Sequence, residues 1–392
     1  MLSEEEARTR ILAAVPTLPA ANVPLCEGAG RFSATELVAT IPLPSFDNSA
    51  MDGYAVIATS ATKGTRLKIV GEQPAGVSSN LRVREGEAVR IFTGAPLPAG
   101  ADAVVMQEGT ERDGDFVLIR SETVAPGEFV RKAGGDLAIG QQILRRGDGL
   151  SPVTLPLLAS QGIESIDVHE RPRVAIVTTG DELVEPGTEL RPGEVFETNG
   201  VMLAGLAEAS GAEVVMRSHC RDDFEELCAV LRDATDNDVV IISGGVSVGE
   251  RDLVRDALRK VGAQIDLWRV AVKPGKPFLF GMRERCAIFG LPGNPVSSFV
   301  TFLIFVRPAL LRMMGAKDLG MARSTAHLSH DITADETRPH YLRGRIEEGR
   351  FSIVGQQESH ALFGLAQSNA LLRVNPGEQL PAGSEVEVLL LE

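Results

Sequence analysis

The sequence predicts a multidomain protein of mixed α/β and β class. A three-layer α/β domain would be joined to a β-rich inserted domain, a mixed helical flanking domain and a small C-terminal β-barrel. The 392 residues are enough for about two to four domains, and 44% are hydrophobic, which is ample for packed cores. Apolar runs of strand length alternate with helical periods in one region, and with glycine and proline in two others. The predicted boundaries are 1–44 plus 141–170 (flanking), 45–140 (inserted), 171–318 (α/β) and 319–392 (barrel, with a sandwich as the alternative).

Composition and charge exclude several classes of partner. The net charge of −14 disfavours nucleic acid and anionic membranes, and the aromatic content of 5% disfavours base-stacking surfaces. The N-terminal segment is charged and has no signal-peptide core. The most apolar run, 299–306, is too short to span a bilayer and is expected to be a buried helix. Four cysteines without CxxC spacing are typical of reduced thiols, so we expect a cytoplasmic protein.

The flanking segments carry helix signals. Ser3 and Glu6 match a capping box, and Ser33 is expected to begin a second helix through residue 38. Ser151 and Pro152 predict the start of a helix that ends near residue 160. Because these helices bracket the β-rich region, that region is interpreted as an insertion.

The α/β domain is predicted from six strands and four helices. Alternation of the two implies a largely parallel sheet that is covered on both faces. Asn199 is expected to cap the first of these helices. The strands are expected at 174–177, 213–218, 238–242, 265–272, 278–280 and 287–289, and the helices at 200–209, 222–233, 251–261 and 296–313.

A glycine-rich loop follows the strand at 238–242. Glycines let the backbone approach a ligand, and the following helix would add its positive dipole end. The loop lacks both GK[ST] and GxGxxG, so it is neither a Walker A nor a dinucleotide motif. We favour a phosphate-binding loop over a simple tight turn. Its residues of interest are Ser243, Gly244, Gly245, Ser247, Gly249 and Asp252.

Three more loops are expected at the same sheet edge, because the carboxyl ends of parallel strands lie together. One of them, 291–298, joins the last strand to the apolar helix, and starting that helix would by itself explain its residues. Asp181 and Glu182 follow one strand, although helix capping alone would also explain them. Lys273 and Lys276 lie in a stiff proline-containing loop, and lysine suits phosphate as a point charge. Carboxylates, lysines and a phosphate loop together favour a Mg²⁺–phosphate site.

Seven collinear stretches, covering about residues 44–300, together resemble the molybdopterin molybdenumtransferase family, the MoeA-type enzymes related to the E domain of gephyrin. The resemblance implies that the α/β domain binds molybdopterin. It implies insertion of molybdate into adenylated molybdopterin, with release of AMP and help from Mg²⁺. It also implies a homodimer whose cleft combines the α/β domain of one subunit with the β-rich domain of the other. The stretches are PSFDNSAMDGYAV, FTGAPLPAGADAVVMQE, GEFVRKAGGDLAIG, TTGDEL, ISGGVSVGERD, VAVKPGKPF and GLPGNPVSS.

The same resemblance implies roles for single residues. The catalytic residues would be Asp52, Thr93, Asp136, Glu182 and Asp252, with Glu182 and Asp252 also holding the metal. Glu197 stands where the family commonly has aspartate, Arg269 where it has lysine, and Gly135 where it has an acidic residue. Substrate would be bound by Arg131, Asp222, Ser243, Gly244, Gly245, Ser247, Gly249, Lys273, Lys276, Pro292, Pro295, Arg343 and Ser359.

Two alternative functions are weighed against this one. A molybdopterin adenylyltransferase has a similar α/β domain but usually stands alone, so the β-rich region argues against it. That enzyme is instead a possible transient partner. A gephyrin-like scaffold predicts loss of Asp52, Glu182 or Asp252, and all three are present. A scaffold role would still be compatible with catalysis.

Overall fold

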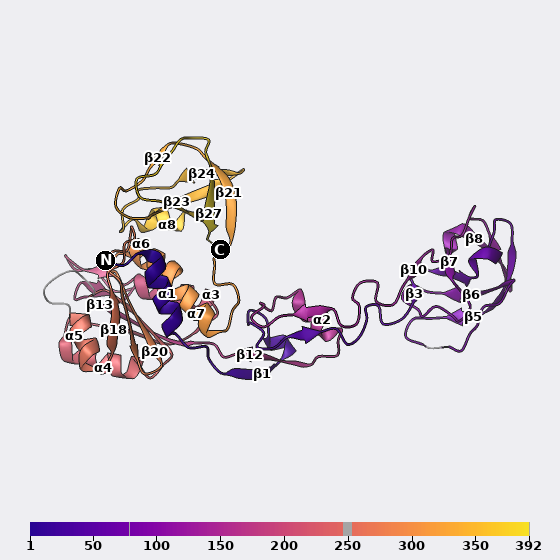
Figure 1. Cartoon of the computed structure of the whole chain (residues 1–392), viewed down its shortest axis with the longest axis horizontal. Coiled ribbons are helices and arrows are strands. Elements are labelled where there is room, and N and C mark those ends of the chain that lie inside the picture. Colours follow the sequence, from indigo (N-terminus) through magenta and orange to yellow (C-terminus); the bar gives the residue numbers. More distant parts are fainter. Residues whose placement is uncertain (78, 246–252, 392) are drawn as a thin grey trace. The chain divides into compact units, whose positions relative to one another are not determined.

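The structure is a computed structural model, and it describes residues 1–77, 79–245 and 253–391. The chain forms two compact units (Figure 1). Unit 1 comprises Met1–Thr35, Arg146–Leu155 and Glu164–Glu392, and unit 2 comprises Glu36–Arg145 and Pro156–Ile163. The finer division into four domains stays a prediction.

A six-stranded sheet forms the centre of unit 1, in the order β16-β13-β17-β20-β19-β18. The first four strands are parallel and the last two are antiparallel to their neighbours, so the largely parallel sheet is confirmed. The strand predicted over 265–272 ends early, because Arg269 turns to a φ of 79°. The strands are β13 (Arg173–Thr179), β16 (Glu213–Cys220), β17 (Val239–Ser243), β18 (Gln264–Trp268), β19 (Leu279–Arg283) and β20 (Cys286–Leu291).

Helices cover both faces of this sheet, as expected (Figure 1). Side chains alternate along β13, so Val174 and Ile176 pack with α1, α3, α6 and α7, whereas Ala175 and Val177 pack with α4 and α5. The helices are α1 (Glu4–Ala14), α3 (Asn199–Ala209), α4 (Phe224–Ala234), α5 (Leu253–Lys260), α6 (Pro295–Thr301) and α7 (Arg307–Met313).

The apolar run predicted to be a buried helix lies in the core. A π-helical turn, Phe302–Val306, joins α6 and α7 into one continuous helix, Pro295–Met313. Its length and composition would allow it to cross a membrane, but 83% of its most apolar window is buried inside the protein. It is therefore a core helix, in agreement with the prediction.

The two helix starts predicted near the N-terminus have opposite outcomes. The capping box is confirmed, since Glu6 N donates to Ser3 Oγ at 3.2 Å and Ser3 N donates to Glu6 Oε2 at 2.9 Å. The helix predicted over 33–38 is wrong. Ser33 Oγ donates to Thr35 O and accepts from Thr35 N, which closes a local turn rather than a helix start, and β2 (Leu37–Val38) pairs with β11 (Gln142–Leu144).

The C-terminal part of unit 1 is a closed barrel of five strands, which confirms the barrel over the sandwich. Its interior contains Leu328, Leu342, Phe351, Leu372 and Val388. The barrel strands are β21 (Arg323–Leu328), β24 (Arg350–Ile353), β23 (His340–Glu347), β25 (Ala370–Val374) and β27 (Glu385–Leu390). The pair β22 (Ile332–Thr333) and β26 (Gln379–Leu380) and the helix α8 (Leu362–Ala366) lie in its connections.

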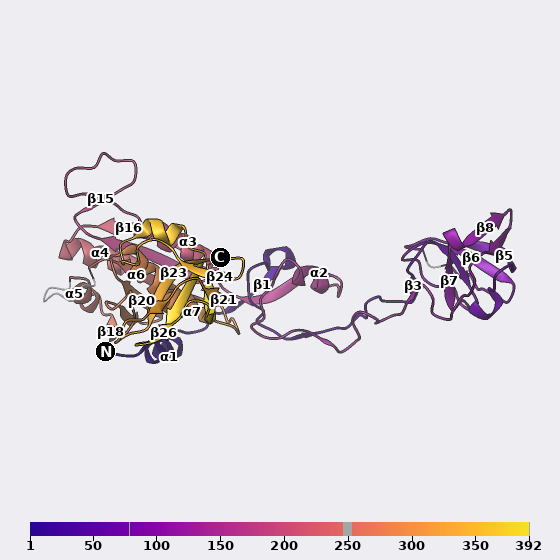
Figure 2. The same cartoon turned by 90° about the horizontal axis from the view of Figure 1, so that it is seen from above.

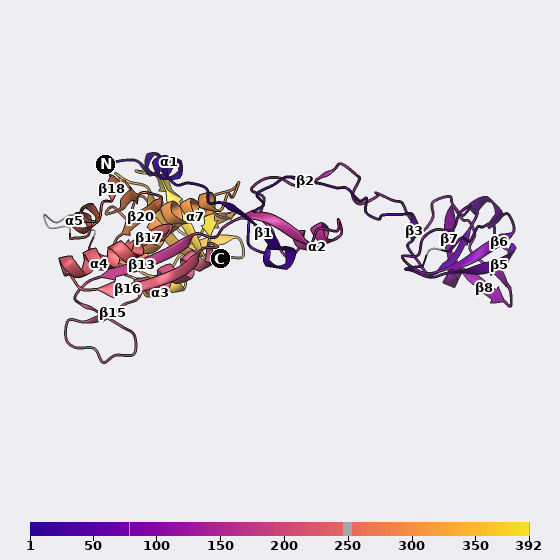
Figure 3. The same cartoon turned by 90° about the horizontal axis from the view of Figure 1, so that it is seen from below.

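Smaller elements complete unit 1. β1 (Ala20–Pro24) pairs with β12 (Ser165–His169), and the turn η1 spans Leu25–Glu27. The predicted helix is present as α2 (Thr154–Ala159), which continues into unit 2, but it begins at Thr154 rather than at Pro152. β14 (Leu183–Val184) pairs with β15 (Val195–Phe196), and the segment between them projects away from the rest of unit 1 (Figures 2 and 3).

Unit 2 is β-rich, as predicted. Its sheet has the order β7-β4-β6-β5-β9-β8, and β3 (Asn48–Ser49) pairs with β10 (Val130–Arg131) beside it. The remaining elements are β4 (Gly53–Val56), β5 (Arg66–Gln73), β6 (Glu87–Ile91), β7 (Ala103–Met106), β8 (Thr110–Asp113), β9 (Phe116–Ile119), η2 (Ala58–Ser60) and η3 (Gln107–Gly109).

Candidate functional site

A cavity of about 760 Å³ lies in unit 1 at the carboxyl ends of β13, β17 and β20. Parallel strands end at this edge, which is where open α/β sheets bind ligands. The barrel contributes His360 and Leu362 to the wall. The sheet side contributes Thr178, Thr179, Gly180, Glu182, Leu183, Val195, Phe196, Glu197, Thr198, Asn199, Asp222, Ser243, Gly244, Gly245, Pro277, Pro292, Gly293, Asn294, Pro295 and Ser297.

The glycine loop forms one wall of the cavity. Gly244 has a φ of 95°, and a Cβ atom there would lie 2.4 Å from Thr179 O. Gly245 has a φ of 65°, and its Cβ would lie 2.5 Å from Val254 Cγ2. Both positions therefore require glycine. Of the six residues predicted in this loop, Ser243, Gly244 and Gly245 line the cavity, and Ser247, Gly249 and Asp252 lie outside the described residues.

Acidic residues gather on another wall. Glu182 and Asp222 line the cavity, and Asp222 N donates to Asp181 Oδ1 at 3.2 Å. The pKa of Asp222 is raised, first by loss of solvent around its carboxyl and then by the negative charges of Asp181 and Glu182. This part of the site therefore carries a negative potential that a bound cation would relieve.

The acidic wall fits a magnesium ion in its donor chemistry. Mg²⁺ uses one or two carboxylates together with substrate phosphates and water. Across residues 1–77, 79–245 and 253–391, no group of three or more His, Cys, Asp or Glu side chains is placed to hold a metal alone. A metal here would thus depend on Glu182 or Asp222 together with ligand oxygens.

Asn199 is a cavity residue whose role the sequence misidentified. The helix cap is Thr198, not Asn199. The Asn199 amide donates to Ser243 Oγ at 2.9 Å and to Gly293 O at 2.6 Å. A carbonyl only accepts, so the nitrogen is assigned to this side and Oδ1 to the other. Thus Asn199 ties the loops after β17 and β20 together.

Two buried oxygens in the cavity wall have no hydrogen-bond partner within the described part of the chain: Asn199 Oδ1 and Thr179 Oγ1. Buried polar atoms are normally satisfied, so these two atoms are candidate ligand contacts. Thr179 ends β13 and Asn199 begins α3, and neither residue was predicted from the sequence to bind a ligand.

The loop after β20 links the cavity to the barrel. Pro292 and Pro295 line the cavity, as a pocket-shaping role requires. Ser359 does not appear in the wall formed by the described residues, but it supports that wall. Asn294 Nδ2 donates to Ser359 Oγ at 2.8 Å, and Val296 N donates to Ser359 O at 3.1 Å. His360, which the sequence left open, lines the cavity.

Arg343 is buried, with 1% of its surface exposed. Its guanidinium donates to the carbonyl oxygens of Gln356, Glu358 and Ala361. Burial lowers the pKa of Arg343. The side chain thus holds the segment that carries Ser359 and His360, and its predicted contact with substrate stays a prediction.

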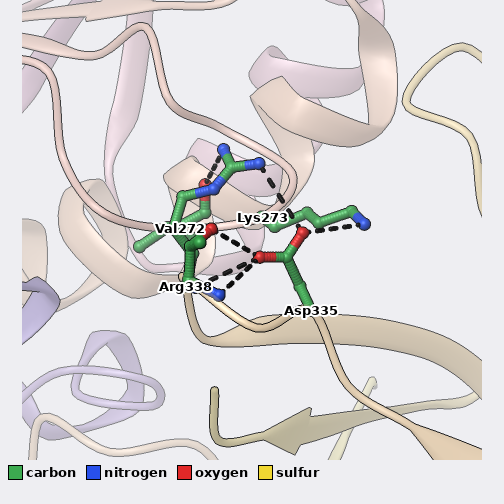
Figure 4. Close-up of polar contacts among 5 residues, drawn as sticks. Val272, Lys273, Asp335 and Arg338 are labelled. Carbon is green, nitrogen blue, oxygen red and sulfur yellow. Dashed lines mark hydrogen bonds and ion pairs between the residues drawn. The ribbon is translucent and has the colours of Figure 1, made fainter. Parts of the chain in front are cut away.

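The lysine loop reaches the cavity through Pro277. Lys276 is exposed, and Lys273 Nζ forms an ion pair with Asp335 Oδ2 at 3.2 Å (Figure 4). Neither lysine is among the described residues that line the cavity. In the chain, Lys276 directly precedes the cavity residue Pro277, and Lys273 lies four residues before it.

Unit 2 contains a second group of predicted residues. Asp52 Oδ1 accepts hydrogen bonds from Thr93 N at 2.7 Å and Thr93 Oγ1 at 2.8 Å. The backbone bond and the hydroxyl bond lower the pKa of Asp52. The two residues, which are 41 positions apart, therefore form one polar cluster, and their catalytic role stays a prediction.

Arg131 and Asp136 line a hollow of about 600 Å³ in unit 2, with Lys132 and Pro44 beside them. Asp136 N donates to Leu43 O at 2.8 Å, and both residues line the hollow. Lys132 Nζ pairs with Asp47 Oδ2 at 2.8 Å. A basic residue and a carboxylate are thus brought to one surface.

Three of the four cysteines lie in the interior of unit 1. All four cysteines are described and free: Cys220, Cys228 and Cys286 are buried and Cys26 is exposed. Burial raises the pKa of Cys220 to about 11 and that of Cys286 to about 12. Burial thus disfavours the thiolate form of Cys220 and Cys286, whose side chains pack in the core of unit 1.

Comparison with known proteins covers nearly the whole chain. Residues 2–162 match the MoeA N-terminal region (domain I and II), residues 175–312 match the "probable molybdopterin binding domain", and residues 325–391 match the MoeA C-terminal region (domain IV). The molybdopterin molybdenumtransferase of Haemophilus influenzae is 37% identical over 385 residues, which are 95% of this chain and 94% of that protein. Molybdopterin molybdenumtransferase 2 of Mycobacterium tuberculosis is 36% identical over 94% of both chains.

A solved structure agrees in fold. The molybdopterin biosynthesis MoeA protein of Pyrococcus horikoshii is 31% identical and matches with a TM-score of 0.86 over 100% of both chains. The multidomain α/β and β fold class is therefore confirmed. The sequence resemblance is confirmed as well, and the chain belongs to the molybdopterin molybdenumtransferase family.

Proposed function

We propose that this chain inserts molybdate into adenylated molybdopterin and releases AMP, in a Mg²⁺-dependent reaction in the cytoplasm. The observation that carries the proposal is the cavity at the sheet edge. It joins a glycine loop, an acidic wall and a proline-shaped wall in a chain related over its whole length to molybdopterin molybdenumtransferases. A phosphate-bearing pterin needs a phosphate-binding loop and an enclosed wall, and the cavity offers both.

Each group of residues in and near the cavity would contact a different part of the substrate. Gly244 and Gly245 would let the backbone approach the phosphate end of the substrate, while Pro292 and Pro295 would bound the pterin. Lys273 and Lys276 would attract the oxyanion, which requires positive charge held in place. Arg343 would keep Ser359 and His360 in position at the rim.

The acidic wall would hold the metal. Glu182 and Asp222, with Asp252 from outside the described residues, are the candidate ligands. A bound Mg²⁺ would neutralise phosphate charge during cleavage of the adenylate. The carboxylates themselves would orient the adenylate end of the substrate. The cation would offset the repulsion from Asp181 and Glu182 that helps to raise the pKa of Asp222.

The direct test adds molybdate and Mg²⁺ to the full chain with adenylated molybdopterin and measures AMP by chromatography. Molybdate-dependent AMP release is the expected result. Folded protein that releases no AMP under these conditions would refute the proposal. Glu182→Gln should remove most of the Mg²⁺-dependent rate, whereas Glu189→Gln, an exposed acid between β14 and β15, should retain it.

We further propose that the enzyme is a homodimer in which Asp52, Thr93, Arg131 and Asp136 act on substrate held by the partner subunit, and that an adenylyltransferase delivers the substrate transiently. Mixing Asp52→Ala and Glu182→Gln subunits tests the first part. Random exchange of a two-fold dimer would restore about a quarter of the wild-type sites if each site uses both subunits. Continued inactivity after verified exchange would show that each site uses one subunit.

A further inference from the structure

The ion pair between Lys273 and Asp335 joins the lysine loop to the barrel part of unit 1 (Figure 4). Nζ and Oδ2 are 3.2 Å apart, and the two side chains are 39% and 19% exposed. The ammonium that the proposed function assigns to an oxyanion therefore already has an anionic partner within the chain.

Asp335 is held firmly by its own segment. Its Oδ1 accepts hydrogen bonds from Thr337 N at 2.9 Å, Thr337 Oγ1 at 2.7 Å and Arg338 N at 3.2 Å. The two bonds from Thr337 are the main cause of the strongly lowered pKa of Asp335, and Lys273 adds to it. The carboxylate is thus a fixed negative charge at neutral pH, and only Oδ2 faces the lysine.

The backbone of Lys273 is fixed as well, so only its side chain is free to change partner. Lys273 N donates to Pro339 O at 2.9 Å, and Tyr341 N donates to Lys273 O at 2.8 Å. Two residues further on, a Cβ atom at Gly275 would lie 2.6 Å from Thr301 Cγ2, so the loop packs tightly on α6. Pro277 of the same loop lines the cavity.

We propose that Asp335 is an intramolecular competitor of the oxyanion: it occupies the Lys273 ammonium until a tetrahedral dianion, molybdate or a phosphate group, takes the place of its carboxylate. The inference rests on the proposed function, because it assumes that Lys273 binds a substrate oxyanion. Asp335 then sets the affinity of this part of the site and keeps weakly held anions from the lysine.

The exchange is feasible because Asp335 would keep other partners. Its Oδ1 bonds are independent of Lys273, and Arg338 Nη2 lies 4.0 Å from Oδ2 while Nη1 donates to Val272 O at 3.3 Å (Figure 4). The neighbouring His340 has a pKa lowered to about 4 by burial and then by Lys273, so it is neutral at pH 7 and does not compete for the carboxylate. Ion pairs with this degree of exposure are weak, whereas a dianion offers the ammonium more charge.

The test measures molybdate binding to the full chain by titration calorimetry. Asp335→Asn keeps an oxygen for Thr337 but removes the charge, so it should lower the Kd for molybdate about two- to fivefold. The matched control is Glu4→Gln, which removes the pair between Glu4 and Arg373 at 3.1 Å, with side chains 18% and 37% exposed. This variant should bind molybdate like the wild type.

A double-mutant cycle separates competition from long-range charge effects. In a Lys273→Met chain, Asp335→Asn should leave the Kd unchanged if Asp335 acts by occupying the lysine. Equal tightening with and without Lys273, or no tightening in the single variant, would overturn the proposal. Asp335→Ala repeats the measurement if the Asn variant does not fold.

Two further arms complete the design. Phosphate in place of molybdate shows which dianion displaces the carboxylate, and tightening for either one supports the competitor role. If the chain releases no AMP but Asp335→Asn still tightens molybdate binding, only the proposed function is refuted. If the chain releases AMP and binds molybdate through Lys273, but Asp335→Asn does not change the Kd for molybdate, only this inference is refuted.

Discussion

Replacing Arg343 by lysine distinguishes a supporting role from direct contact with substrate. The guanidinium donates to three carbonyl oxygens of the segment that carries Ser359 and His360. Lysine keeps the charge but has one nitrogen, so we expect about two of these bonds to be lost. Hydrogen bonds of charged groups contribute at least about 1.5 kcal/mol each, which gives about 3 kcal/mol of lost stability in the barrel.

Hydrogen exchange of peptides covering 354–366, together with thermal unfolding, measures this loss. Arg345→Lys is the matched control, because Arg345 lies on the same strand with its side chain exposed and pairs with Glu347 at 2.6 Å. That change should alter stability by less than about 1 kcal/mol. The reasoning is refuted if Arg343→Lys leaves exchange and unfolding as in the control but weakens substrate binding, since Arg343 would then act on the substrate itself.

Three further outcomes follow from the structure. Gly244→Ala should destabilise the cavity loop by about 2 kcal/mol or more, because its φ is positive and its Cβ would lie 2.4 Å from a carbonyl oxygen, whereas Gly205→Ala, with no neighbour within 4 Å in α3, should be neutral or stabilising in thermal unfolding. Thr93→Val removes a hydrogen bond that lowers the pKa of Asp52, so the acid limb of the pH–rate profile should shift to higher pH. An unshifted limb would show that the protonation of Asp52 does not control the rate. His340 has a folded pKa near 4 against an ordinary value near 6.5, so the unfolded chain binds more protons between these values and stability should rise with pH across this window, a slope that His340→Leu should reduce in denaturant titrations.

Local signals in the sequence were reliable where the structure is decided locally. The capping box at Ser3 and the strand–helix alternation both appear in the structure, because hydrogen bonds across three residues and packing faces with a fixed period depend on near neighbours. The helix expected after Ser33 failed for the opposite reason. Its strand partner, β11, lies about a hundred residues away, and pairing with it overrides local preference.

The candidate site also has features that the sequence predicts and features that depend on the tertiary structure. The sequence alone identified the loops, their glycines and their charged residues, since strand ends and turn chemistry are written in short motifs. Only the tertiary structure showed that Asn199 ties two loops together, that Arg343 supports the rim and that Lys273 is paired with Asp335. Each of these contacts joins a side chain to a residue 13 to 94 positions away, and partners at such separations depend on the packing of whole elements. The sequence was therefore sufficient to predict the family and the fold class. The contacts that each charged residue makes could be identified only in the folded structure.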